Sequence, residues 1–306
     1  HRRPMAPLLR VYGALLLVQL LFGLHYLTTQ LVVERINPVE WAAVRISIAG
    51  VILLLLHRHR IMHWPVGAEW RQVALLAALG VVVNMVFFAM GMERTTPAHG
   101  ALIMCMVPVL TLTFAIALGY ERASRAKQAA LCLALAGALV LLEADRFRLT
   151  GAYLIGDLLV FINATSFALF LALSRQAVDR HGAMGLTALV MGGSAVAMAP
   201  LALWSGVTHA DAWTALPQHV LLAAVYTIIL ATVVTYSLNY YALGRVPSSQ
   251  VALFIYLQPL IATSTSIAVG RDVLSPRLLL AAALILGGIA LTALSYRDDA
   301  EESGLS

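Results

Sequence analysis

The feature that most constrains this chain is a series of apolar stretches, each about 20 residues long, separated by short polar clusters. An α-helix rises about 1.5 Å per residue, so roughly 20 residues can cross a hydrocarbon layer about 30 Å thick. Only 11% of the 306 residues are charged, whereas soluble domains carry about 25%. A soluble core could not enclose the 61% of residues that are hydrophobic, so we expect much of this surface to face lipid. The alternating segments of a membrane β-barrel are absent from the sequence.

We therefore predict an all-α integral membrane protein with ten spanning helices. The first apolar run lacks a small-residue cleavage site, so it is interpreted as a span and not as a signal peptide. Prolines mark the ends of the connections at positions 38, 97, 217, 247 and 276. The longest connection covers 205–217, and the acidic tail 297–306 is expected in solvent. The predicted spans are 11–33, 39–56, 70–92, 98–119, 126–142, 153–173, 185–205, 218–243, 248–269 and 277–296.

The distribution of basic residues predicts the orientation of these spans. Of the 20 Lys and Arg residues, about 13 fall on the side of the N-terminus and about six on the other, and Arg45 lies inside a span. This bias places both termini in the cytoplasm, and we expect the bacterial cytoplasmic (inner) membrane. The net charge of +5 is explained by these connections, so the expected partners are the lipid bilayer and a small-molecule substrate, with no nucleic acid.

The sequence contains an internal repeat at an offset of 151 residues. An offset of five spans is odd, so the two copies would cross the membrane in opposite directions. Inverted repeats of this kind are typical of transporters that alternate access to a site between the halves. We predict the halves as 11–142 and 153–296. The coinciding residues include Arg94 with Arg245, Pro108 with Pro259, Gly119 with Gly270, Ser124 with Ser275 and Gly137 with Gly288.

The repeated segments resemble a known family. The run FFAMGMERTTPAHGALIMCMVPVLTLTFAIALGYE and its second copy, YYALGRVPSSQVALFIYLQPLIATSTSIAVGRD followed by LILGGIALTAL, are similar to the EamA domain of the drug/metabolite transporter (DMT) superfamily. The spacing of Pro38 and Arg45 also fits this pattern. The resemblance implies two inverted five-helix halves around a central cavity lined mainly by spans 1, 3, 4, 6, 8 and 9. It further implies export of amino acids or other metabolites.

Polar side chains within the spans are the candidate cavity residues, because burying them in lipid is costly unless they meet partners or water. Their alternative role is hydrogen bonding between packed helices. The fourth span has no aromatic cluster and instead contains Met104, Cys105, Met106 and Pro108, which argues against export of aromatic amino acids. The candidate substrate-binding residues are Gln19, His25, Asn84, Met104, Asn163, Ser166, Tyr236, Asn239, Tyr240, Tyr256 and Gln258.

Three further residues are candidates for gating or structure. Pro108 and Pro259 remove backbone donors and can bend their helices. Arg45 needs carbonyls, an anion or an aromatic ring to be stable within a span. It could attract a substrate carboxylate or phosphate, or it could tie its helix to a neighbouring backbone.

The sequence favours a secondary transporter, with export of small polar or amphipathic metabolites by alternating access. It carries no Walker A motif and no paired Cys and His spacing, so no nucleotide, metal or other cofactor is expected. The alternatives are an intramembrane enzyme, which would need a nucleophile with a base or clustered carboxylates, and a structural membrane protein. No acidic residue lies in the middle of a span, so a carboxylate proton relay is not indicated, and no enzymatic activity is expected.

Overall fold

The computed structural model describes residues 5–61, 64–122, 124–142, 151, 153–268 and 275–302, and every regular element among them is a helix. The predicted all-α class is therefore confirmed for this part of the chain. The first half contains α1 (Met5–Val33), α2 (Pro38–His57), η1 (Arg58–Arg60), α3 (Glu69–Ala77), η2 (Ala78–Val83), α4 (Asn84–Arg94), α5 (Pro97–Met104), α6 (Met106–Ala117) and α7 (Arg125–Leu141). The second half contains α8 (Leu154–His181), α9 (Ala183–Thr208), α10 (Ala210–Thr214), α11 (Gln218–Ile228), η4 (Ile229–Val234), α12 (Thr235–Leu243), α13 (Ser248–Leu253), η5 (Phe254–Tyr256), α14 (Leu257–Ala268) and α15 (Pro276–Glu302).

The helices begin where the sequence provides start signals. Asn37 caps α2 by accepting a hydrogen bond from the Val39 amide at 3.0 Å, with Pro38 in the first turn. Thr96 caps α5 in the same way, ahead of Pro97. Between α8 and α9 a single residue, Gly182, turns the chain with φ of 72°, a conformation that favours glycine. Each of the five predicted prolines begins or immediately precedes a helix.

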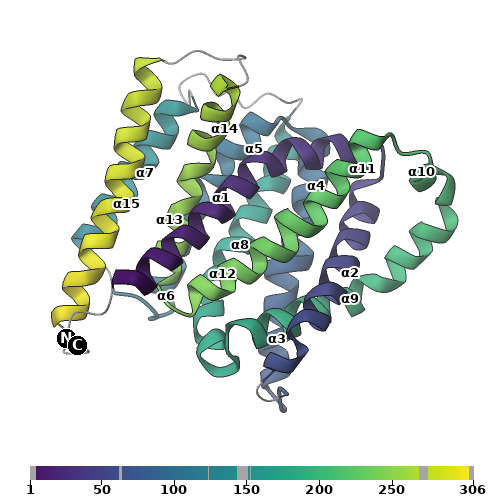
Figure 1. Cartoon of the computed structure of the whole chain (residues 1–306), viewed down its shortest axis with the longest axis horizontal. Helices are drawn as coiled ribbons and strands as arrows, with labels where there is room; N and C mark the ends of the chain where they lie inside the picture. Colours follow the sequence, from purple (N-terminus) through teal and green to yellow (C-terminus); the bar gives the residue numbers. More distant parts are fainter. Residues whose placement is uncertain are drawn as a thin grey trace.

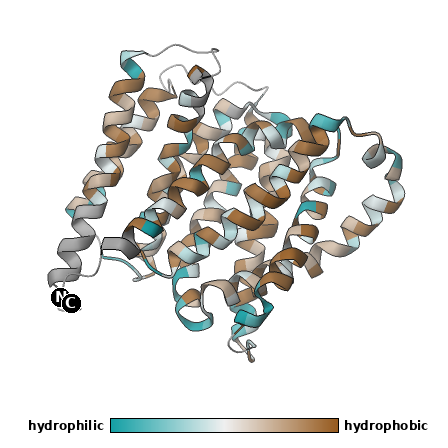
Figure 2. Cartoon of the chain, in the orientation of Figure 1, coloured by the Kyte–Doolittle hydropathy of each residue, from teal (hydrophilic) through white to brown (hydrophobic). Residues whose placement is uncertain are grey.

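Seven helical segments are long and apolar enough to cross a membrane: 9–33, 38–60, 69–94, 98–117, 154–181, 183–208 and 218–243. The other three predicted spans are helical as α7, α13 to α14, and α15, but they fall outside these seven, and the total of ten stays a prediction. Leucines such as Leu20, Leu27 and Leu31 are exposed along α1, and these apolar side chains are more stable in contact with lipid than with water. Figure 2 shows apolar residues covering the helices of the bundle. The protein is an integral membrane protein.

The boundaries of several elements differ from those predicted. Helix α8 continues to His181, beyond the predicted end at 173, and α15 continues to Glu302, into the segment predicted as a tail. The connection predicted over 205–217 contains the end of α9 and the short helix α10. Charged residues end an apolar window before they end a helix, because a helix can extend past the hydrocarbon layer into water.

Two helices contain π-helical segments. Segment η2 separates α3 from α4, and η4 separates α11 from α12. The π-segments begin at Ala78 and Ile229, 151 residues apart. The same spacing relates the first residues of α4 and α12, of α5 and α13, of α6 and α14, and of α7 and α15.

Helices α7 and α15 pack side by side at one edge of the molecule, on the left of Figure 1. Their contact is reciprocal. A Cβ on Gly137 would lie 2.8 Å from the carbonyl oxygen of Ala281, and one on Gly288 would lie 2.6 Å from that of Ala130. Gly137 and Gly288 are 151 residues apart, as are Ala130 and Ala281. Helices α2 and α9 pack together elsewhere in the bundle, and α1, α8 and α12 lie between these two pairs (Figure 1).

Candidate functional site

A cavity of about 50 Å³ lies among helices of both halves of the chain. One buried water needs roughly 10–15 Å³ of such space, so in this conformation the cavity has room for a few water molecules but not for a larger solute. Its walls mix aromatic and sulfur-containing side chains with amides and one arginine. The lining residues are Phe22, His25, Tyr26, Arg45, Asn84, Met85, Phe88, Met104, Asn163, Phe167, Tyr236, Ile255 and Gln258.

Arg45 is the only Lys or Arg among these lining residues, and it is 3% exposed. Its Nε donates to Thr232 Oγ1 at 2.8 Å, and its Nη2 lies 3.5 Å from the carbonyl oxygen of Ala231. Both acceptors belong to η4. Arg45 thus ties α2 to the backbone of a neighbouring helix, which was one of its two predicted roles, while it also borders the cavity.

The π-helical segment η2 supplies carbonyl oxygens to side chains of other helices. A π-turn widens the helix and shifts its hydrogen bonds, so carbonyls can be left for outside donors. Ser166 Oγ donates to the Leu79 carbonyl at 2.6 Å, and the Tyr236 hydroxyl donates to the Gly80 carbonyl. Just beyond the segment, Asn163 Nδ2 donates to the Asn84 carbonyl at 2.7 Å. These three bonds join α8 and α12 to the interrupted helix.

The second π-segment, η4, uses hydroxyls of its own helix. Thr232 Oγ1 donates to the Thr227 carbonyl at 2.7 Å, and Thr235 Oγ1 donates to the Ala231 carbonyl at 2.9 Å. Thr232 therefore donates to its own helix while accepting from Arg45. The buried guanidinium is thus held at the π-helical segment that separates α11 from α12.

A chain of polar side chains connects α1 with α14 beside the cavity. The Tyr26 hydroxyl donates to Gln258 Oε1 at 2.9 Å, and Gln258 Nε2 donates to Gln19 Oε1 at 2.8 Å. His25 stacks on Phe88 with ring centroids 5.3 Å apart, and its Nδ1 lies 3.2 Å from Thr29 Oγ1. Polar and aromatic surfaces thus alternate along the wall formed by α1.

The structure brings seven of the predicted residues together at the cavity: His25, Arg45, Asn84, Met104, Asn163, Tyr236 and Gln258. Gln19 accepts a hydrogen bond from the lining residue Gln258, whereas Ser166 is not among the lining residues and donates to the Leu79 carbonyl. Asn239, Tyr240 and Tyr256 are buried but are not among the lining residues. Tyr240, one turn beyond Tyr236, meets Phe170 edge-on at 5.7 Å. Pro108 and Pro259 are buried just after the breaks at Cys105 and at η5.

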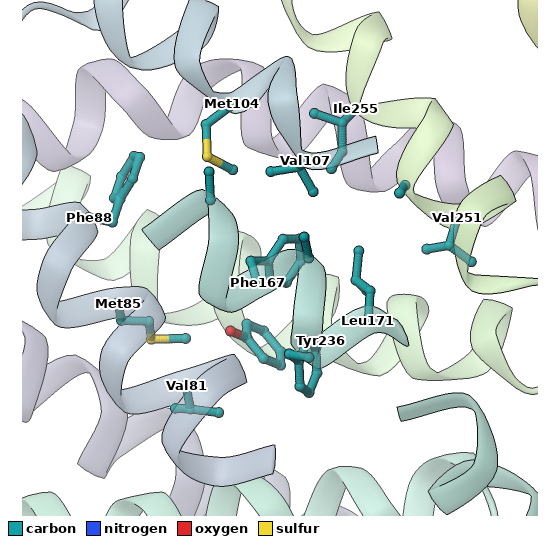
Figure 3. Close-up of a cluster of buried hydrophobic side chains, with 14 of the residues drawn as sticks. Val81, Met85, Phe88, Met104, Val107, Phe167, Leu171, Tyr236, Val251 and Ile255 are labelled. Atoms are coloured by element: carbon teal, nitrogen blue, oxygen red, sulfur yellow. The ribbon is translucent and has the colours of Figure 1, made fainter. Parts of the chain in front are cut away.

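Six lining residues were not predicted: Phe22, Tyr26, Met85, Phe88, Phe167 and Ile255. Figure 3 shows Met85, Phe167 and Tyr236 converging, with Phe88, Met104 and Ile255 around them. Apolar side chains at helical spacing look alike in sequence whether they face lipid, a neighbouring helix or a cavity. The one available signal was the shared face of Gln19, Phe22 and Tyr26 on the first span.

Polar pairs occur beyond the cavity at two helix beginnings related by the repeat offset. Near the start of α5, His99 Nδ1 lies 3.0 Å from Asp157 Oδ2, and Thr95 Oγ1 donates to Asp157 Oδ1 at 2.5 Å. Near the start of α13, Gln250 Nε2 donates to the Tyr12 hydroxyl at 2.7 Å. His99 and Gln250 are 151 residues apart. Each pair joins its helix to the first part of α8 or of α1.

No group of three or more His, Cys, Asp or Glu side chains within the described ranges is placed to hold a metal ion. Glu40 accepts from Ser205 Oγ at 2.5 Å and lies 2.9 Å from His209 Nδ1. The carboxylates of Glu40 and Asp157 are thus engaged near the ends of their helices, and neither is among the described residues that line the cavity.

Comparison with known proteins identifies the family. The chain matches the EamA-like transporter family twice, over residues 9–143 and 154–294. It is 25% identical to an uncharacterized transporter of Archaeoglobus fulgidus, covering 80% of this chain and 84% of the relative. It is 24% identical to the uncharacterized inner membrane transporter YedA of Escherichia coli K12, covering 94% and 92%.

A crystal structure that is 21% identical in sequence superposes with a TM-score of 0.70, covering 94% of this chain and 96% of the other. At this identity the likeness shows a shared fold. The names of the relatives and the matched family point to a transporter rather than an enzyme. Two consecutive family matches spanning nearly the whole sequence leave no large segment unassigned, and the chain belongs to the EamA-like transporter family.

Proposed function

We propose that this protein is a secondary transporter that moves small metabolites, amino acids or related amphipathic solutes, by alternating access around the central cavity. The observation that carries the proposal is the composition of the cavity wall. Residues of α1, α2, α4 and α5 from the first half face residues of α8, α12 and α14 from the second. A site formed between two halves changes its access when one half moves against the other.

The repeated geometry supports an arrangement of ten spans in two inverted halves. Element starts recur at 151 residues from η2 to α7, and the contact of α7 with α15 is reciprocal about Gly137 and Gly288. Reciprocal contacts between equivalent residues are what a two-fold relation between two units produces. Such a relation provides two conformations of comparable energy, which alternating access requires.

The polar pairs at the helix beginnings are the proposed closures at the two ends. His99 with Asp157 would close the outer end, and Gln250 with Tyr12 would close the inner end. The excess of basic residues on the side of the N-terminus supports this orientation in an inner membrane. Export from the cytoplasm is the proposed direction.

Counterflow into liposomes tests the function. Purified protein is reconstituted into vesicles loaded with unlabelled amino acids, carboxylates, sugars or cationic drugs, and uptake of the matching labelled solute is measured. We expect counterflow above empty vesicles for at least one class. Counterflow for none of them would contradict the proposal.

Cross-linking tests the closures independently. In a chain with Cys105 and Cys132 replaced by Ala, the pair His99→Cys with Asp157→Cys, or Tyr12→Cys with Gln250→Cys, is joined by a short bis-methanethiosulfonate linker. We expect either link to stop transport and reduction to restore it, while the single-cysteine chains keep transport after the same treatment. Continued transport in the linked chains would show that transport does not require these ends to open. A protein with a purely structural role would not be affected by the link.

A further inference from the structure

The buried arginine carries an unused binding capacity at the cavity. A guanidinium has five N–H donors in a planar fork, and the structure gives Arg45 two acceptors, Thr232 Oγ1 and the Ala231 carbonyl oxygen. Neither acceptor is charged. Among the described residues Arg45 has no carboxylate partner, and the cavity lining contains no Asp or Glu.

A charge that is removed from water costs several kcal/mol unless it is paired and fully hydrogen-bonded. One hydroxyl and one long contact at 3.5 Å do not provide that compensation. An anion in the cavity would provide it, because a carboxylate matches the guanidinium fork with two parallel hydrogen bonds. A carboxylate is therefore the group that best complements the Arg45 guanidinium in this cavity.

The rest of the wall limits what that anion can be. Arg45 is the only Lys or Arg among the described residues that line the cavity, so one negative charge is matched and a second would be left uncompensated. Around it stand the apolar side chains of Phe22, Met85, Phe88, Met104, Phe167 and Ile255, several of which Figure 3 shows facing a common space. These surfaces fit an apolar group attached to the anion.

The wall offers little to an ammonium group. A buried ammonium needs anionic or several neutral acceptors, and none of the lining residues in the described part of the chain is acidic. The neutral acceptors are few: Asn163 Oδ1, which is buried and has no hydrogen-bond partner among the described residues, and the side-chain amide of Asn84, which also lines the cavity. The Gln258 oxygen already accepts from Tyr26.

We propose that the cavity binds small organic monoanions, with the carboxylate on the Arg45 guanidinium and an apolar side group against the aromatic and methionine wall. This inference rests on the proposed function and narrows its substrate class. Because the wall leaves an α-ammonium group poorly paired, an amino acid binds more weakly than the corresponding carboxylate without the amino group. Because the cavity is small in this conformation, binding accompanies its widening.

Thermal stability of the purified protein measures binding directly, since a bound solute raises the apparent Tm by mass action. Four probes share one side group: 4-methylpentanoate, leucine, leucinamide and 4-methylpentanamide. We expect 4-methylpentanoate to raise Tm, and leucine to need a concentration at least about tenfold higher for the same shift. The two amides, which lack the carboxylate, should not change Tm even at concentrations at least tenfold above the half-maximal concentration of 4-methylpentanoate. Equal stabilisation by 4-methylpentanamide, or no stabilisation by any carboxylate, would overturn the inference.

Variants locate the carboxylate. Arg45→Gln should weaken 4-methylpentanoate binding on the order of tenfold or more, the usual loss for a charged hydrogen-bonding partner. Arg45→Lys, which keeps the charge without the fork, should be intermediate. Arg175→Gln is the matched control, because Arg175 also donates to backbone carbonyls, of Leu243 and Val246, but lies outside the cavity lining. Unchanged binding in a folded Arg45→Gln or Arg45→Lys chain would contradict the site, and the probe series on the unmodified protein decides the matter if neither variant folds.

The outcome is separable from that of the proposed function. Carboxylate binding that depends on Arg45, without counterflow, would sustain the site and remove the transport proposal. Counterflow of cationic or neutral solutes with no carboxylate binding would sustain transport and overturn the anion site.

Discussion

At the scale of single residues, the bundle depends on side chains that complete the hydrogen bonding of interrupted backbones. Ser166 and Tyr236 both donate to carbonyls within η2. In a membrane the released carbonyls have no water to turn to, so an outside donor must satisfy them. These hydroxyls act as structural pins for the π-segment.

Replacing Ser166 by Ala should lower stability because the Leu79 carbonyl loses its donor from α8. The expected loss is about 0.5–2 kcal/mol, the usual range for a hydrogen bond between membrane helices. Apparent Tm in detergent provides the measurement. The neighbouring Thr165→Ala is the control, because Thr165 is partly exposed and donates only to Phe161 of its own helix. Equal effects of the two substitutions would show that Ser166 is not pinning η2.

The carboxylate of Asp157 is a second residue whose role can be isolated. Asp157→Asn removes the charge that Thr95 and His99 approach at 2.5 and 3.0 Å, and hydrogen bonds to charged groups contribute about 1.5–3 kcal/mol. We expect a lower Tm for this variant. Asp179→Asn, in the same helix α8 with a side chain that is 59% exposed, should leave Tm nearly unchanged. A stable Asp157→Asn chain would argue against a firm closure at this end.

The sequence identified several of these residues by type but could not assign their partners. A polar residue stands out within an apolar span, and for this reason the sequence predicts Asn163, Ser166 and Tyr236 as candidate binding residues. Whether each faces a cavity or a carbonyl depends on helix rotation, which one residue per turn does not determine. Phe88 and Phe167 carried no such exception, since their chemistry suits lipid, core and cavity equally.

At the scale of elements, close contact between α7 and α15 depends on small residues at corresponding positions. Gly137 and Gly288 let each helix approach a carbonyl of the other, as is usual where membrane helices meet through small side chains. The two glycines occupy equivalent places in the repeat, so a substitution at either should have a similar effect.

Gly288→Ala places a Cβ 2.6 Å from the Ala130 carbonyl oxygen, so the helices must separate. Overpacking of this kind costs about 1–3 kcal/mol, and Tm should fall accordingly. Gly287→Ala is the control one residue away, where a Cβ would meet only Leu133 Cδ2 at 3.4 Å. There the better helix propensity of alanine should offset any cost. Similar stabilities for the two variants would refute the close contact.

The apolar runs predict where the helices lie, but they predict neither how far α8 and α15 extend beyond those runs nor the π-segments. Residues 78–83 read ALGVVV and residues 229–234 read ILATVV, and both are compatible with an unbroken α-helix. A π-turn arises from how the helix packs against donors such as Tyr236, which are distant in sequence. The sequence indicates the breaks near Pro108 and Pro259 more clearly, because proline has no N–H to donate to the carbonyl four residues earlier.

At the scale of the whole molecule, the offset of 151 residues was readable in the sequence because prolines, glycines and interhelical charges recur at it. The location of the cavity was only partly predictable, since it depends on how helices from both halves rotate and meet. The repeat nevertheless makes a definite claim about topology. Residues separated by 151 positions at helix ends must lie on opposite sides of the membrane.

Cysteine labelling at Arg94 and Arg245 tests that claim. Arg94 is the last residue of α4, and Arg245 lies in the turn just after the equivalent helix α12. Five spans separate the two arginines in the proposed topology, so an odd number of crossings puts them on opposite faces. In a chain lacking Cys105 and Cys132, an impermeant maleimide applied to intact cells should label Arg94→Cys and reach Arg245→Cys only after permeabilisation. Arg58→Cys, which follows α2, provides the control and should behave like Arg245→Cys. Labelling of positions 94 and 245 from the same side would mean that the two halves cross the membrane in the same direction. Alternating access by two inverted halves would then be excluded for this protein.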